Sequence, residues 1–99
     1  MILEHALITV RPDAHDEFQA GITRAREVIS AAPGFRSFAL HRGIETPDRY
    51  LLLVGWETLE DHTEGFRQSE AFAEWRSHIQ PFFDGAPEVD HYTPLAGLA

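Results

Sequence analysis

The sequence predicts an α+β domain in which strands and helices follow one another in the order β-α-β-β-α-β. Three observations predict it. Some short segments are continuously apolar or alternate between apolar and polar residues, two longer segments have hydrophobic residues at helical spacing, and Gly or Pro stands at most junctions between them. A chain of 99 residues has the size of one domain, so we expect residues 1–99 to share a single core.

The first strand is expected over residues 2–11. One of its faces carries His5 between Leu3 and Leu7, and the other face is apolar except for Glu4. Hydrophobic residues on both faces are typical of a strand that is covered on both sides.

The first helix is expected to follow directly, with Asp13 as its N-terminal cap and Pro33-Gly34 at its end. Apolar residues recur at helical spacing between these two points. Two strands are then expected over residues 35–42 and 49–57, because each is rich in hydrophobic residues and a loop with Gly and Pro joins them as a hairpin.

A second helical region is expected after Thr58, which together with Asp61 resembles a capping box. Ser69 is expected to cap a second piece of this region, in which apolar residues form a stripe that ends near Pro81. A turn and a short last strand over residues 88–93 complete the order.

This order defines the ferredoxin-like α+β fold, a four-stranded antiparallel sheet with both helices on one face. The run from Tyr50 to Val54 has no polar alternation, which indicates burial on both faces of the sheet. Since the chain has no third helix to cover the second face, we expect a homodimer in which two sheets face each other.

Composition and charge exclude several classes of function. The formal net charge is −8 and the eight cationic residues, all Arg, are scattered, which argues against nucleic acid and against anionic membrane surfaces as partners. The chain has no Cys, so it has no disulfide or thiolate metal site, and it suits a reducing compartment. With no apolar run of membrane-spanning length and no signal-peptide pattern, we expect a cytoplasmic protein.

No cofactor is expected from the sequence. The six histidines show neither the H-x-H nor the H-x-x-x-H spacing of common metal sites, and there is no Gly-rich phosphate loop or dinucleotide motif. We therefore expect no bound metal, flavin or nucleotide.

Several short motifs resemble those of a known family. They are Pro33-Gly34-Phe35, Trp56-Glu57-Thr58, His62, Gly65-Phe66-Arg67 and Ser69-Glu70-Ala71-Phe72. Over about residues 3–93 the chain is similar to the antibiotic biosynthesis monooxygenase (ABM) family of dimeric α+β barrel proteins. The resemblance implies a homodimer with a pocket in each subunit between sheet and helices.

Known members of that family oxidise polycyclic phenols or quinols with O₂ and no prosthetic group, degrade haem, or isomerise small phosphorylated carbonyl compounds. By resemblance we expect a cofactor-independent monooxygenase that oxidises a small aromatic phenol or quinol. Two alternatives stay open on the same fold: a non-catalytic domain that binds a small molecule, and an isomerase of a small carbonyl compound, whose phosphorylated substrates would need arginines around the pocket.

Two histidines are candidate catalytic bases, because imidazole titrates near neutrality and can accept a phenolic proton. His5 corresponds to a pocket position of the haem-degrading members; the alternative is a core histidine bonded to the backbone. His62 lies one helical turn before Phe66, so both share a face; the alternative is an exposed polar residue.

The substrate-binding candidates are Phe66, Trp75 and His78. Phe66 and Trp75 belong to an aromatic-rich second half that could stack against a flat ring. The alternative for these two is ordinary core packing. His78 lies beside Trp75 on the predicted helix, and its alternative is a half-exposed surface position.

Overall fold

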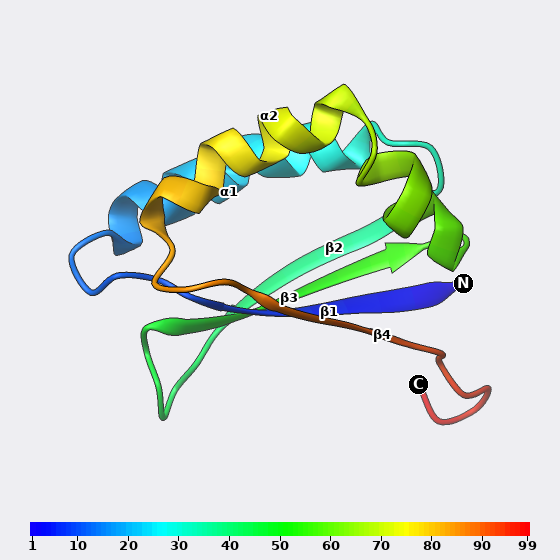
Figure 1. Ribbon diagram of the computed structural model, residues 1–99. Coiled ribbons are helices and arrows are strands. Elements are labelled where there is room, and N and C mark those ends of the chain that lie inside the picture. Colours follow the sequence, from blue (N-terminus) through cyan, green and yellow to red (C-terminus); the bar gives the residue numbers. More distant parts are fainter.

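The computed structural model describes residues 1–99 and has one four-stranded antiparallel sheet in the order β2-β3-β1-β4. The strands are β1 (Ile2–Thr9), β2 (Phe35–Arg42), β3 (Arg49–Trp56) and β4 (Glu88–Tyr92). Two helices, α1 (His15–Ser30) and α2 (Glu70–Ile79), lie side by side over one face of this sheet (Figure 1). The predicted ferredoxin-like α+β fold is confirmed, and none of its helices is long and apolar enough to cross a membrane.

The core fills the space between the helices and the sheet. In β1 the even-numbered residues Glu4, Ala6 and Ile8 are buried on the helix side, because successive side chains of a strand point to opposite faces. The helix α1 places Phe18 and Ile22, one turn apart, against that face. Burial of apolar side chains in this layer is the main stabilising contribution to the fold.

Two short helices flank α2 and complete the connections. A π-helix, η1 (Asp61–Phe66), connects β3 to α2, and a 3₁₀ turn, η2 (Gln80–Phe82), follows α2. The expected capping box is present before η1: the Thr58 N–H donates to the Asp61 carboxylate, and the Asp61 N–H donates to the Thr58 hydroxyl, both at 3.2 Å.

Two expected helix caps are absent. The helix α1 begins at His15 with Ala14 before it, and Asp13 instead forms an ion pair with Arg11 at 3.6 Å. Ser69 does precede α2, but its hydroxyl donates to the carbonyl of Phe66 at 2.6 Å and caps no N–H group. In both cases a neighbouring partner offers the side chain a local contact that competes with the helix terminus.

The helices α1 and α2 approach each other closely where α1 has a glycine. A Cβ atom on Gly21 would lie 2.0 Å from the carbonyl oxygen of His78 on α2. Only a residue without a side chain fits this contact, so the sequence sets the spacing of the helix pair at this point.

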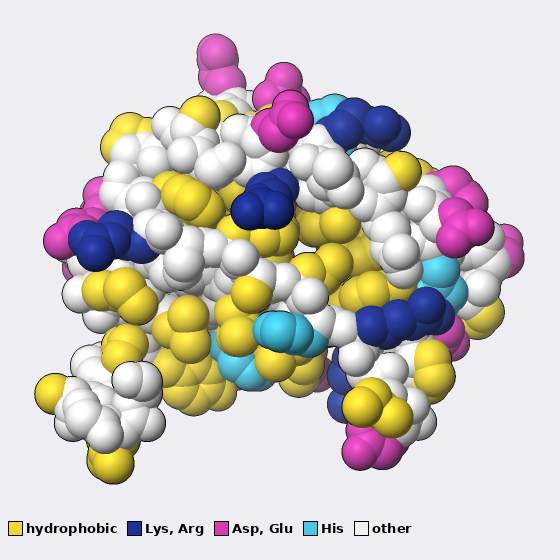
Figure 2. All heavy atoms as spheres, turned by 180° about the vertical axis from the view of Figure 1, so that it is seen from behind, with side chains coloured by type: hydrophobic (Ala, Val, Ile, Leu, Met, Phe, Trp, Pro, Cys, Tyr) yellow, Lys and Arg dark blue, Asp and Glu magenta, His cyan; other side chains and the backbone are white.

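The second face of the sheet has no cover within the chain. Its central side chains are half-buried: Leu3, His5, Leu7, Ala39, Leu51 and Leu53. The β2–β3 hairpin and the C-terminal segment both project on this side of the sheet (Figure 1). Figure 2 shows hydrophobic and histidine side chains gathered between these two projections, with charged side chains mostly over the helices and the two ends.

Candidate active site

A cavity of about 680 Å³ lies between α2 and the sheet. This volume is within the range of roughly 300–1,000 Å³ that is usual for small-molecule sites. The sheet contributes Ala6, Ile8 and Leu52 to its walls, and α2 contributes Phe72 and Trp75. Most of the lining is hydrophobic, so a bound ring would be removed from water.

Polar side chains meet at the wall of this cavity around the carboxyl group of Glu4. The indole Nε1 of Trp56 donates a hydrogen bond to Glu4 Oε1 at 3.0 Å. His62 Nε2 lies 3.3 Å from the same oxygen, and His62 Nδ1 lies 2.8 Å from His91 Nε2. The three residues Glu4, His62 and His91 therefore form a continuous polar chain.

The local fold explains why these side chains meet. Glu4 of β1 is paired with His91 of β4, so both side chains point to the helix side of the sheet. Trp56 ends β3, and six residues later η1 returns over it and stacks His62 on its indole, with ring centroids 5.3 Å apart and an interplanar angle of 17°. The π-helix η1 buries His62 and Phe66 on the same side.

Burial and the charge of Arg67 shift the pKa values of Glu4, His62 and His91. Burial raises the pKa of Glu4, against the hydrogen bond from Trp56 and the charge of Arg67, which both lower it. Burial, with the charges of Arg67 and His91, lowers the pKa of His62 to about 4. Burial and Arg67 also lower the pKa of His91, against the charge of Asp90. His62 is therefore a neutral imidazole at neutral pH.

One oxygen of Glu4 remains available to a ligand. Both protein contacts of the carboxyl group are to Oε1, and Oε2 accepts no hydrogen bond from the protein. Every fully buried side-chain oxygen or nitrogen in the protein has a hydrogen-bond partner. Since Oε2 has none, it is not fully buried and a ligand can reach it. Because Glu4 lines the cavity, its open oxygen can receive a proton from a bound molecule.

The structure places His5 away from this cavity. His5 lies on the opposite face of β1 from Glu4, half-buried, with its ring edge-on to Tyr92 at a centroid distance of 5.3 Å. The expected position of His5 in a pocket between sheet and helices is therefore wrong. The reason is that both faces of β1 are apolar, so the sequence pattern did not show which face the helices cover.

The other candidates divide into two groups. His62, Phe66 and Trp75 all line the cavity, and the rings of Phe66 and Trp75 are edge-on to each other at 6.2 Å. Phe66 and Trp75 also belong to the buried core, so packing and cavity lining coincide. His78 is half-buried on α2 and does not line the cavity.

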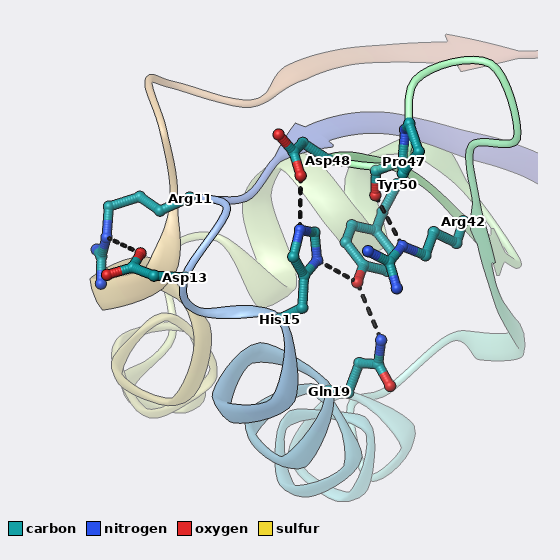
Figure 3. A network of polar contacts seen from close by, with 8 residues as sticks. All are labelled: Arg11, Asp13, His15, Gln19, Arg42, Pro47, Asp48 and Tyr50. Atoms are coloured by element: carbon teal, nitrogen blue, oxygen red, sulfur yellow. Dashed lines mark hydrogen bonds and ion pairs between the residues drawn. The ribbon is translucent and has the colours of Figure 1, made fainter.

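A separate polar network ties α1 to β3 and the preceding loop (Figure 3). His15 Nε2 lies 2.7 Å from Asp48 Oδ1, and His15 Nδ1 lies 2.8 Å from the hydroxyl of Tyr50. Gln19 donates to the same hydroxyl at 3.0 Å. None of these residues lines the cavity, so the network anchors the start of α1 and does not extend the site.

Glu4 and His91 were not among the site residues expected from the sequence. Arg67 and Arg76 were expected near the pocket only under the isomerase alternative, together with Arg36 and Arg42, and of these four only Arg67 and Arg76 line the cavity. One signal for Glu4 was present: it is the only charged residue among the apolar residues of its strand face. The position of His91 depends on the register between β1 and β4, which no local pattern encodes. No group of three or more His, Asp or Glu side chains is arranged to hold a metal ion.

The fold and the cavity together define an α+β domain with a ligand-sized cavity between its helices and its sheet. Residues 1–77 match the family model of the antibiotic biosynthesis monooxygenases, so the chain belongs to the ABM family. The resemblance stated from the sequence motifs is thereby confirmed.

Individual relatives agree with this assignment. The chain is 38% identical over 92 residues to the Bacillus subtilis protein YczJ. The match covers 93% of this chain and 97% of YczJ. It is similar to the crystal structure of a Bordetella bronchiseptica protein assigned to the antibiotic biosynthesis monooxygenases, with 42% identity, a TM-score of 0.92 and coverage of 95% of this chain and 96% of that one.

A more distant structure shares the fold. SnoaB, a cofactor-independent oxygenase from Streptomyces nogalater, is 18% identical with a TM-score of 0.83, and the match covers 98% of this chain and 95% of SnoaB. At this identity the likeness concerns the fold.

Proposed function

We propose that this protein is a cofactor-independent monooxygenase that oxidises a small aromatic phenol or quinol with O₂. The observation that carries the proposal is the accessible carboxyl oxygen of Glu4 in an apolar cavity. The other oxygen of Glu4 accepts a hydrogen bond from Trp56 and lies 3.3 Å from Nε2 of the neutral His62. Family membership and the similarity to SnoaB in fold support the same reaction class.

In the proposed reaction, Glu4 and His62 act together as the base. A phenol bound against Phe66 and Trp75 gives its proton to Glu4, whose raised pKa brings its basicity closer to that of a working base at neutral pH. The resulting phenolate is electron-rich enough to reduce O₂. One oxygen atom enters a ring carbon to give a quinone and the other leaves as water, so the substrate supplies all the electrons and no outside reductant is needed.

The series of polar contacts Glu4–His62–His91 gives the proton a route away from the ring. For an outward transfer His62 carries its proton on Nδ1: Nε2, 3.3 Å from Glu4 Oε1, accepts the proton from the protonated carboxyl, and Nδ1–H donates to His91 Nε2. His91 is on the edge strand β4 and only half-buried. A proton received at Glu4 can therefore reach His91 by two transfers and pass to solvent by a third.

The uncovered sheet face supports a homodimer as the working form. Six half-buried side chains on this face are mostly apolar, and a second copy with its sheet facing the first would remove them from water. In that arrangement His5 would lie at the contact between subunits, away from the base at Glu4.

The test is oxygen uptake with a panel of one- to three-ring phenols and quinols, led by 1-naphthol, in protein purified without added cofactor. We expect one O₂ consumed per quinone formed, and a loss of about a hundredfold or more in Glu4→Gln and in His62→Gln, which is the usual contribution of a positioned base. His5→Gln distinguishes Glu4 and His62 as the base from His5 as the base, because His5 lies on the opposite face of β1 from Glu4.

Each outcome has a definite meaning. Loss of activity in His5→Gln with full activity in Glu4→Gln would refute the base proposed here and return the role to His5. Ring binding without O₂ uptake by any substrate in the panel would refute the monooxygenase. It would favour the non-catalytic binding domain, or, if a carbonyl compound is converted, the isomerase.

A further inference from the structure

The charge around the cavity is opposite to that of the whole chain. The protein has 16 acidic residues and 8 arginines, with a formal net charge of −8. The cavity is nevertheless lined by two arginines, Arg67 and Arg76, and by a single acid, Glu4, whose pKa is raised by burial. Both arginines are exposed to solvent and also line the cavity, so a bound molecule meets two cations and one acid in an otherwise strongly acidic protein.

Arg76 is held in place but has no anionic partner. Its Nε donates to Gln80 Oε1 at 3.1 Å, and its guanidinium carbon lies 5.7 Å from the ring centroid of Phe72. No carboxylate lies within ion-pair distance, in contrast to Arg11 and Arg36, which pair with Asp13 and Glu57. The two terminal nitrogens of Arg76 are free to bind the two oxygens of an anion.

Arg67 is also without a carboxylate partner. It follows η1 directly, and its charge acts on all three members of the chain, Glu4, His62 and His91. The side chain of Arg67 is exposed and forms no ion pair with a carboxylate, so a ligand anion can reach it.

We propose that the substrate of this cavity is an aromatic ring that carries a carboxylate, and that Arg67 and Arg76 bind this carboxylate. The proposal rests on the proposed function for the reaction, and it adds the class of molecule that is recognised. The ring is assigned by the aromatic walls, Phe66, Phe72 and Trp75, which lie between or beside the two arginines in the sequence and line the same cavity. The acidic group is assigned by the two unpaired guanidinium groups.

The test compares two probes that differ only in charge, 6-hydroxy-2-naphthoate and its methyl ester, by calorimetric titration of the full chain without O₂ turnover. We expect the carboxylate to bind about tenfold more tightly than the ester at low ionic strength, which is the usual effect of a charge-assisted hydrogen bond. The preference should shrink in about 0.5 M salt, because part of it is electrostatic. Equal affinity of the two probes at low salt would overturn the proposal.

The arginines are tested by Arg67→Gln and Arg76→Gln. Each should remove most of the preference for the carboxylate and leave the affinity for the ester unchanged. Arg24→Gln is the matched control, since it removes the same charge from an exposed position on α1 that does not line the cavity. A preference that survives in both cavity variants, or that falls equally in Arg24→Gln, would show that general charge and not this site is responsible.

A third probe, glycerol 3-phosphate, separates the ring from the charge. We expect it to bind at least tenfold more weakly than 6-hydroxy-2-naphthoate, and tighter binding would overturn the assignment of an aromatic ligand. Because affinity is measured without reaction, selective binding of the carboxylate in a protein that consumes no O₂ would contradict the proposed function alone. Oxidation of neutral phenols with no carboxylate preference would contradict this inference alone.

Discussion

Acidification should destabilise this protein through His62. The pKa of His62 is lowered from 6.5 to about 4 in the folded state, so the folded protein binds this proton less readily than the unfolded chain does. The stability associated with His62 is therefore complete above about pH 6.5 and is lost as the pH falls from there towards 4. With about 1.4 kcal/mol per pKa unit, the free energy of unfolding should fall by about 3 kcal/mol over this interval.

The neighbours of His62 modify this slope in known directions. The pKa of His91 is also lowered, so His91 adds to the loss of stability on acidification. The pKa of Glu4 is raised, so Glu4 has the opposite effect: its contribution is present below its unfolded pKa and is lost as the pH rises through its folded pKa. Arg67 stays charged throughout and contributes no titration of its own.

The assay is urea unfolding between about pH 7 and pH 4.5, monitored by circular dichroism. The protein concentration is held fixed, because a dimer would unfold in a concentration-dependent way. In His62→Gln we expect most of the pH dependence in this range to disappear. His78→Gln is the matched control, because it replaces a half-buried imidazole outside the cluster. Parallel slopes in the wild type and His62→Gln would refute the reasoning, whatever the absolute stability of the variant.

The remaining predictions concern packing, assembly and composition. Gly21→Ala should lower the free energy of unfolding by about 2–3 kcal/mol, because the added Cβ would lie 2.0 Å from the carbonyl oxygen of His78. Gly65→Ala is the control, because its Cβ would lie 3.8 Å from the nearest atom. Equal losses of stability in the two variants would contradict the packing argument. Sedimentation at micromolar concentration should give about twice the chain mass of 11.2 kDa, and a stable monomer would refute the facing-sheet dimer. The purified protein should be colourless and poor in transition metals, so a stoichiometric flavin spectrum or a bound metal would contradict the expectation drawn from the sequence.

The order of elements followed from the sequence because each element has its own local signal. Helical spacing ends at Pro33-Gly34, and the run from Tyr50 to Val54 is hydrophobic enough to define the central strand alone. The side-chain caps were predicted less accurately, because Asp13 and Ser69 had nearby partners that no pattern reveals; Ser69 nevertheless stands at the N-cap position of α2, as expected.

The candidate site was predicted on α2 and η1 but not on the sheet. His62, Phe66 and Trp75 lie on helices, where one apolar face marks the side that packs. On β1, both faces are apolar, and the choice between Glu4 and His5 depends on which face receives the helices. That choice is made by tertiary packing, so the sequence alone could not decide it.

The position of Glu4 should cost the protein stability, which leads to the last prediction. A charged carboxylate on a buried side chain is unfavourable because it is poorly hydrated, and burial accordingly raises the pKa of Glu4. Glu4→Gln keeps an oxygen that can accept from Trp56 and removes the charge. We therefore expect the variant to be about 1–2 kcal/mol more stable than the wild type near neutral pH, although the proposed base is lost.

The pH dependence makes this prediction specific. Because the pKa of Glu4 is raised, its carboxyl is protonated in the folded protein at low pH, where glutamine imitates it closely. The gain of Glu4→Gln should therefore be small near pH 4 and should grow as the pH rises through the folded pKa of Glu4. Urea unfolding of both proteins at the two pH values decides it. A variant that is less stable than the wild type at neutral pH would mean that the carboxylate stabilises the fold, and it would refute the reasoning from the burial of Glu4.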